Sequence, residues 1–217
     1  MSHLIITVES DKCNIRMEGD KMRKKERVAK FIRGITVPPC LVLVLIIILA
    51  NSSRGIFKNW VEMIVAVFCL GIVPALAYPL QPYLKKYREG GREAQRNLAF
   101  LCNLIGFTIA VFFGYVFQVN IELQLIFHMY LLSVILLTIC NKGLHLRASG
   151  HACGVTGPLL LLLYFGGVNY VITCVLLGIL IAWASLELKC HTKKELVMGS
   201  LVCLVAFLGA WGISLCY

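Results

Sequence analysis

Two short segments of the chain carry the residue types that could do chemistry. The first segment reads Lys142-Gly-Leu-His-Leu-Arg147-Ala-Ser149-Gly150-His151 and runs directly into an apolar stretch. A Ser-Gly turn that leads into a helix presents free backbone N–H groups, and such a helix start favours a phosphate. We therefore expect an anion-binding turn, with Ser149 capping the helix and His151 in its first turn. The alternative is that Ser149 is only a cap and His151 only a histidine at the level of the lipid headgroups.

The second segment reads Lys189-Cys-His191-Thr-Lys-Lys-Glu195. His191 and Glu195 are four residues apart, so on a helix they share a face, and the carboxylate can hold the imidazole in one tautomer. Such a pairing raises the basicity of a ring nitrogen, which suits a nucleophile or a general base. The alternative is an ordinary surface pair without a chemical role.

The elements that must position these segments are apolar helices. The chain has 217 residues, of which 59% are hydrophobic and 15% are charged, and its mean hydropathy is +0.82. The apolar residues form long unbroken blocks, which excludes a soluble globule, a disordered chain, a coiled coil and a collagen-like repeat. We expect an all-α fold, a polytopic membrane helix bundle, with a basic cytoplasmic segment at 1–34 and an integral membrane domain at 35–217.

About seven spans are predicted, because each apolar block approaches the ~20 residues needed to cross a bilayer. The first block has Pro38 and Pro39 at its start and could pass for a signal-peptide core, so six spans are the fallback. The polar segment ahead of it is longer than a usual signal-peptide n-region, which argues against cleavage. The predicted spans are 35–50, 60–80, 97–118, 122–141, 152–167, 169–187 and 196–216.

The basic residues lie almost entirely on one side of these spans. The chain has a net charge of +10, and of its 21 Lys and Arg residues only Arg54 and Lys58 fall in loops of the opposite side. The positive-inside rule therefore places the N-terminus in the cytoplasm and Tyr217 outside. We expect the chain to lie in the plasma (inner) membrane. Both chemical segments then face the cytoplasm.

The charge and the cysteines limit the partners and cofactors. No basic domain interleaved with aromatic residues, zinc spacing or helix-turn-helix is present to read nucleic acid, whereas anionic lipid headgroups account for the same residues. The ten cysteines include no CxxC pair. The two aspartates, Asp11 and Asp20, precede the first span, so no paired-aspartate magnesium cluster is expected, and we predict neither metal nor cofactor. We expect His128 to make a hydrogen bond between helices and Glu62 to lie at a solvated interface.

The two segments together resemble the type 2 phosphatidic acid phosphatase superfamily. That family has three blocks: a Lys separated by six residues from Arg-Pro, then Pro-Ser-Gly-His, then Ser-Arg followed by five residues, His, three residues and Asp. Here Ser149-Gly150-His151 matches the second block, and His191 with Glu195 keeps the spacing of the third. The resemblance covers roughly residues 142–199 and implies a core of six helices, with one extra helix here.

The chain departs from these blocks at several positions. Ala148 replaces the proline, Glu195 replaces the aspartate, and Ala184-Ser185 stands where Ser-Arg is expected. Lys189 can replace that arginine only in part, because an ammonium does not reproduce bidentate guanidinium binding. The candidates for phosphate binding are Ser149 and Gly150 together with the cations Lys142, Arg147, Lys189, Lys85, Arg88, Arg92 and Arg96.

The resemblance implies a membrane lipid-phosphate phosphatase that acts on phosphate esters of glycerolipids or on isoprenoid (di)phosphates. His191 would form a phosphohistidine, Glu195 would orient it, and His151 would protonate the leaving alkoxide. The alternatives are a phosphotransferase of the same family and a non-catalytic membrane protein that binds anionic lipids. A small transporter is less favoured, because charges near the middle of the membrane are scarce. The oligomeric state stays open.

Overall fold

The computed structural model describes residues 24–216, apart from the side chain of Arg92, and this part of the chain contains helices and no β-strand. Most of the predicted 1–34 segment lies outside the described residues. The helices are α2 (Lys24–Ile35), α3 (Pro38–Ala50), α4 (Trp60–Ala66), η1 (Val67–Ile72), α5 (Val73–Ala75), α6 (Ala77–Leu80), η2 (Gln81–Tyr83), α7 (Lys85–Arg88), α8 (Gly91–Val116), α9 (Ile121–Thr138), η3 (Ile139–Gly143), α10 (Gly150–Gly166), η4 (Gly167–Tyr170), α11 (Val171–Glu187) and α12 (Lys193–Ser214).

The first apolar block is one arm of a bent pair of helices. Helices α2 and α3 meet at an angle of 54°. Pro38 and Pro39 occupy the first turn of α3, where proline is tolerated, but neither offers an N–H with which to continue α2. The Thr36 hydroxyl donates to the Ile32 carbonyl at 2.7 Å and closes the end of α2. The two prolines therefore separate the basic helix from the apolar helix that follows it.

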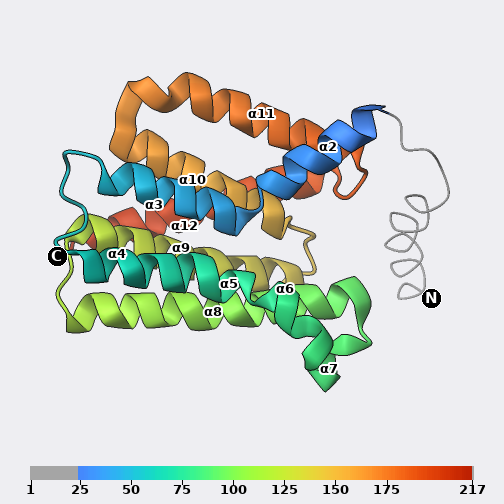
Figure 1. Cartoon of the computed structure of the whole chain (residues 1–217), viewed down its shortest axis with the longest axis horizontal. Coiled ribbons are helices and arrows are strands. Elements are labelled where there is room, and N and C mark those ends of the chain that lie inside the picture. Colours follow the sequence, from blue (N-terminus) through green and yellow to red (C-terminus); the bar gives the residue numbers. More distant parts are fainter. Residues whose placement is uncertain (1–23, 217) are drawn as a thin grey trace.

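Five helical stretches are long and apolar enough to cross a membrane, or six when the bent pair counts as one span. The predicted number of seven is not confirmed, because the spans expected at 152–167 and 169–187 form one helical stretch, Gly150–Glu187. This stretch folds back at Gly167, whose φ of 67° is a conformation that glycine adopts easily. Beyond the turn, the Cys174 thiol contacts the Leu159 carbonyl at 3.6 Å. Figure 1 shows α10 and α11 lying side by side.

Helix α9 lies in the core of the bundle. Of its most apolar window, 61% is buried, against 33% or less in the other candidate spans. His128 of α9 bonds to the Tyr115 hydroxyl of α8 at 2.8 Å, which confirms the expected hydrogen bond between helices. The expectation of a solvated Glu62 was wrong: this residue is buried, and its carboxylate accepts the Lys58 N–H at 2.8 Å just ahead of α4.

The outer helices expose apolar side chains along their whole length. Large exposed residues include Ile64, Phe112, Ile172, Leu176 and Val205. A water-soluble protein rarely displays so much contiguous apolar surface, whereas lipid chains cover it at no cost. The fold is therefore compatible with an integral membrane protein.

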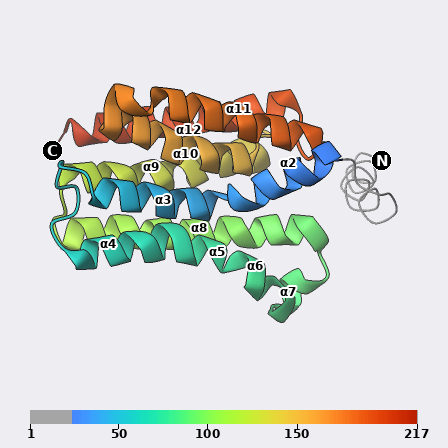
Figure 2. The same cartoon turned by 45° about the horizontal axis from the view of Figure 1, so that its top comes forward.

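The two ends of the bundle differ in charge. One end holds α2, α7 and the loops at 144–149 and 188–192, on the right of Figure 1, and we refer to it as the basic end. The other end holds the described end of α12, η4 and the loops at 51–59 and 117–120, with Arg54 and Lys58. Figure 2 shows the same division from a second direction. Both chemical segments of the sequence thus lie at the basic end.

Candidate functional site

The first chemical segment is a loop that a side chain holds closed. Asn141 donates from Nδ2 to the Leu137 carbonyl at 2.9 Å and to the Ala148 carbonyl at 3.1 Å, and its Oδ1 accepts the Ala148 N–H at 3.1 Å. These bonds fix the position at which the chain enters α10. There the Ser149 hydroxyl accepts the Ala152 N–H at 3.2 Å, so Ser149 is the N-cap, as predicted. His151 consequently lies in the first turn of the helix.

The second segment pairs His191 with Glu195, but not along a helix as expected. Thr192 is the N-cap of α12, so the helix begins at Lys193 and His191 lies just before it. Thr192 and Glu195 form a capping box, in which Glu195 Oε2 accepts the Thr192 N–H at 3.3 Å. The same oxygen lies 3.2 Å from His191 Nδ1. The expected contact is therefore present, and it arises because a capping-box carboxylate reaches back past the cap.

A backbone hydrogen bond joins the two segments. The Ser149 N–H donates to the Glu195 carbonyl at 3.0 Å. This approach depends on Gly199, since a Cβ at that position would lie 2.3 Å from the Ser149 carbonyl oxygen. Further along the two helices, the Thr156 hydroxyl donates to the Ser200 hydroxyl at 3.0 Å. The start of α10 is thus held directly against the start of α12.

The two histidines and two arginines form one electrostatic cluster at this junction. The charges of Arg33 and His191 interact electrostatically with the His151 ring. The charges of Arg33 and Arg96 interact in the same way with the His191 ring. Arg33 comes from α2 and Arg96 from α8, so four separate parts of the chain contribute. The structure therefore pairs His191 with Glu195. It also places Arg33 where its charge affects both histidines and Arg96 where its charge affects His191.

Burial lowers the pKa of His191 below its ordinary value. Arg33 and Arg96 act in the same direction, whereas the hydrogen bond to Glu195 and its charge oppose them. The His191 side chain is 23% exposed and that of Glu195 is 17% exposed. Since the contact with Glu195 uses Nδ1, Nε2 is the nitrogen that remains for a substrate. A neutral imidazole in this arrangement can act as a nucleophile at neutral pH.

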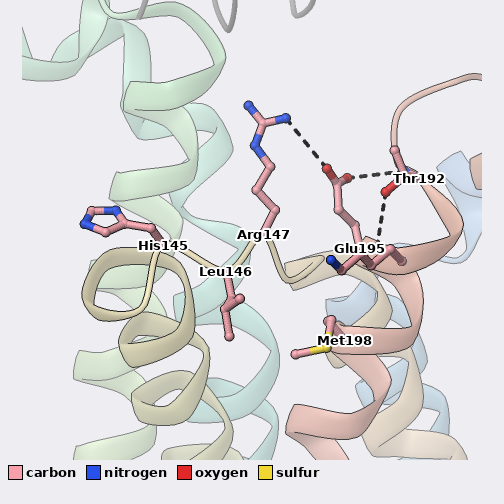
Figure 3. Close-up of a pocket in the computed structure, with 7 residues that line it drawn as sticks. His145, Leu146, Arg147, Thr192, Glu195 and Met198 are labelled. Carbon is pink, nitrogen blue, oxygen red and sulfur yellow. Dashed lines mark hydrogen bonds and ion pairs between the residues drawn. The ribbon is translucent and has the colours of Figure 1, made fainter. Parts of the chain in front are cut away.

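A pocket of about 320 Å³ opens beside Glu195. Figure 3 shows Arg147 extending over this pocket toward the Glu195 carboxylate, Met198 below it, and the His145 ring pointing away. Arg147 Nη1 lies 3.8 Å from Glu195 Oε1. Because the Arg147 side chain is 57% exposed, this ion pair is screened by water and adds little stability. Arg147 is thus free to exchange its carboxylate partner for an incoming anion.

The remaining predicted phosphate ligands lie at different places relative to the two histidines. Lys142, in the last turn of η3, and Lys189, in the loop after α11, are exposed at the basic end. Lys85 and Arg88 belong to α7, which projects from the opposite side of the basic end in both overall views. Arg88 is paired with Glu89 at 3.4 Å. Of the cations predicted from the 85–96 region, Arg96 therefore lies where its charge affects His191, whereas α7 lies apart.

Two residues of this site were missed by the sequence analysis. Arg33 was counted only as part of the basic N-terminal segment, although its position in the last turn before the first apolar block could have marked it as a residue at the membrane surface. Asn141 gave no signal, because a single amide at the end of an apolar block is not distinctive. Both act through tertiary contacts that spacing along the chain does not reveal.

Comparisons with known proteins leave the assignment to the site itself. The chain matches no protein-family model, no curated protein and no solved structure. Within residues 24–216, no three His, Cys, Asp or Glu side chains are grouped so that they could hold a metal ion. The chemistry must therefore be argued from the histidines, Glu195 and the cations around them.

Proposed function

We propose that the chain is an integral membrane lipid-phosphate phosphatase that acts without a metal ion through a phosphohistidine. The observation that carries this proposal is the junction between the two segments. The Ser149–Glu195 backbone bond holds a capped helix start, with His151 in its first turn, against a histidine paired with a carboxylate. Nucleophilic phosphoryl transfer needs a nucleophile, an oriented partner and an acid on one side of the same phosphate.

The proposed reaction has two displacements. In the first, His191 Nε2 attacks phosphorus, the bond from phosphorus to the ester oxygen breaks, and His151 gives a proton to the leaving alkoxide. In the second, water attacks the phosphohistidine, His151 takes a proton from that water, and phosphate leaves with His191 restored. Glu195 orients the His191 ring through Nδ1 and stabilises its positive charge. Cations around the phosphate stabilise the charge on its oxygens.

The proposed topology has seven spans, with the N-terminus and the basic end in the cytoplasm of a plasma (inner) membrane. The positive-inside rule supports this orientation, because Arg54 and Lys58 are the only basic residues of the loops at the other end. Helices α10 and α11 would be separate spans, since each has 17 residues, the lower limit for crossing a bilayer. Six of these helices would form the phosphatase-like core.

The proposed substrates are phosphatidate-like or phosphatidylglycerophosphate-like lipids and isoprenoid phosphates or diphosphates. Exposed apolar side chains reach along the helices from the basic end, so a lipid tail can lie against them while its phosphate reaches the site. Burial of the tail contributes about 0.8 kcal/mol per CH₂ group.

The test is phosphate release by the detergent-purified chain from a panel of glycerolipid and isoprenoid phosphates with EDTA present. The variant His191→Ala removes the proposed nucleophile. His145→Ala is the matched control, because His145 lines the same pocket but its ring points away from Glu195 (Figure 3). EDTA-resistant release that is lost in His191→Ala and kept in His145→Ala supports the proposal. Equal release by both variants contradicts the phosphohistidine.

Two alternatives use the same residues. A lipid phosphotransferase would pass the phosphoryl group from His191 to an alcohol, so adding glycerol or another alcohol would yield a new phosphate ester. A non-catalytic protein that binds anionic lipids is favoured by the absence of an arginine beside Ser185. In that case no lipid phosphate is hydrolysed, and vesicles containing phosphatidate bind the wild type and His191→Ala equally.

A further inference from the structure

Helix α2 delivers one arginine into the histidine cluster. Arg33 lies in the last turn of α2. Just before it, Ile32 packs with Ala29 against Ala184 and Leu188 at the end of α11. Just after it, Pro38 contacts α10 at Gly154, where a Cβ would lie 2.7 Å from the proline ring. Both flanks of Arg33 are thus packed against the bundle, and its Nη1 atom is buried there.

The guanidinium of Arg33 is buried in part and lacks a partner there. Arg33 Nη1 is buried and makes no hydrogen bond among the described residues, and the same is true of His151 Nε2. A buried donor on a charged group destabilises the fold when it is left without an acceptor. The structure thus holds two unsatisfied nitrogens at the place where its cations gather.

Positive charges outnumber negative charges around the two histidines. Arg33 and Arg96 act on His191, and the one carboxylate that acts on the same ring is Glu195. That carboxylate is already engaged by His191, Thr192 and Arg147. An anion with several acceptor oxygens would therefore satisfy both the charge and the missing hydrogen bonds.

We propose that Arg33 of α2 is a ligand of the substrate phosphate and replaces the arginine that is missing next to Ser185. This inference rests on the proposed function, because the phosphate in question is the one that His191 attacks. A guanidinium presents planar paired donors that match two phosphate oxygens, which an exposed lysine such as Lys189 does not. The helix that precedes the first span thus forms one wall of the phosphate site.

The matched control lies on the same helix. Lys30 is one turn before Arg33 and is exposed, so Lys30→Ala removes a positive charge from α2 without touching the cluster. Arg33→Ala removes the ligand, and Arg33→Lys keeps the charge while it removes the planar fork. The lysine variant also keeps the test valid if the alanine variant does not fold, as judged by its thermal unfolding in detergent.

The experiment measures two quantities on the full chain in detergent. One is the binding of inorganic phosphate by calorimetry, and the other is the KM for phosphate release from a short-chain phosphatidate. We expect Arg33→Ala to weaken phosphate binding and raise KM by about tenfold or more, as loss of a charged hydrogen bond does. Arg33→Lys should lie between the alanine variant and the wild type, and Lys30→Ala should match the wild type.

The outcomes separate this inference from the proposed function. If phosphate binds with the expected dependence on Arg33 but no lipid phosphate is hydrolysed, the ligand assignment stands and the phosphatase proposal fails. If hydrolysis depends on His191 and Arg33→Ala has the KM and phosphate affinity of the wild type, the phosphatase stands and the assignment of Arg33 is wrong. Equal losses in Lys30→Ala and Arg33→Ala would also overturn it, because general attraction by a basic helix would then account for binding.

Discussion

The Ser149 N–H donates to the Glu195 carbonyl at 3.0 Å and so joins the two segments that carry the candidate chemistry. Ser149 is a helix cap and Glu195 belongs to a capping box, so each residue also fixes the start of its own helix. One bond between these two starts places His151 and His191 near each other. The site is therefore an outcome of helix capping, and its geometry should be sensitive to changes that separate α10 from α12.

The substitution Gly199→Ala should separate them. A Cβ at this position would lie 2.3 Å from the Ser149 carbonyl oxygen, and backbone atoms cannot move aside as a flexible side chain can. We expect a loss of about 1–3 kcal/mol in the free energy of unfolding, as for other overpacked positions. Phosphate release should fall as well, because the histidines move apart.

Gly212→Ala is the control for this substitution. Gly212 lies in the same helix and has open space around its Cβ position. Alanine favours a helix over glycine by up to about 1 kcal/mol, so this variant should be as stable as the wild type or more stable. The measurement is the thermal unfolding midpoint in one detergent. If Gly199→Ala unfolds at the same temperature as Gly212→Ala, the close approach to Ser149 does not exist.

A second prediction concerns the loop clamp. Asn141→Ala removes two hydrogen bonds to the Ala148 backbone and one to Leu137. Because Ala148 is buried, its N–H and carbonyl lose their partners, at about 1–3 kcal/mol for each unsatisfied group. The loop at 142–148 should then become accessible to a protease that cleaves after Lys142 and Arg147.

Asn51→Ala serves as the control for the clamp. Asn51 makes a single exposed bond, to the Ile47 carbonyl at 2.8 Å, at the opposite end of the bundle. Its loss should leave both the unfolding midpoint and the cleavage pattern nearly unchanged. Equal cleavage of the two variants would mean that Asn141 does not hold the loop.

Some of this arrangement could be predicted from the sequence, because its causes are local. The apolar blocks indicate helices, the Ser-Gly turn indicates the cap at Ser149, and a separation of four residues indicates the contact between His191 and Glu195. Even there the local detail differed, since His191 lies before the N-cap Thr192 and does not share the helix with Glu195. The separation of four residues still predicted the contact, because the Glu195 carboxylate reaches back to His191 in a capping box as it would along a helix.

Other parts of the arrangement depend on contacts between distant segments. The basic residues near the N-terminus predict the orientation of the chain in the membrane whatever the direction of their side chains. Arg33 differs from its neighbours only because the adjacent Ile32 packs against Ala184. Glu62 is buried, and the Lys58 N–H satisfies its carboxylate, a contact that the position of Glu62 near the end of an apolar block does not reveal.

A third prediction separates the carboxylate of Glu195 from its structural role. Glutamine at the third position of a helix also completes a capping box, so Glu195→Gln should keep the start of α12 intact. It loses the negative charge that supports a positive charge on His191. We expect phosphate release to fall by about 10²–10⁴-fold, as when the carboxylate behind another catalytic histidine is replaced by an amide.

The control for this prediction is Glu187→Gln at the end of α11, which removes the same charge at the basic end. The two variants should unfold at similar temperatures, and only Glu195→Gln should lose activity. A matching loss of activity in both would indicate that net charge, rather than orientation of His191, matters.

The last prediction is the acid limb of the pH profile. Burial, Arg33 and Arg96 lower the pKa of His191, whereas Glu195 raises it, and the net effect is a value below the ordinary 6.5. The imidazole that attacks phosphorus must be neutral, so kcat should stay level as the pH falls from 7.5 to about 6.5 and decline only below that. In Arg96→Gln one of the lowering charges is gone, so the acid limb should move to higher pH. In Glu195→Gln the raising charge is gone, so the limb in the residual activity should move to lower pH. Neither substitution removes the substrate phosphate, so shifts of the acid limb in opposite directions indicate that His191, and not the phosphate, is the group that titrates. If the acid limb moves in the same direction in both variants, His191 is not the titrating nucleophile.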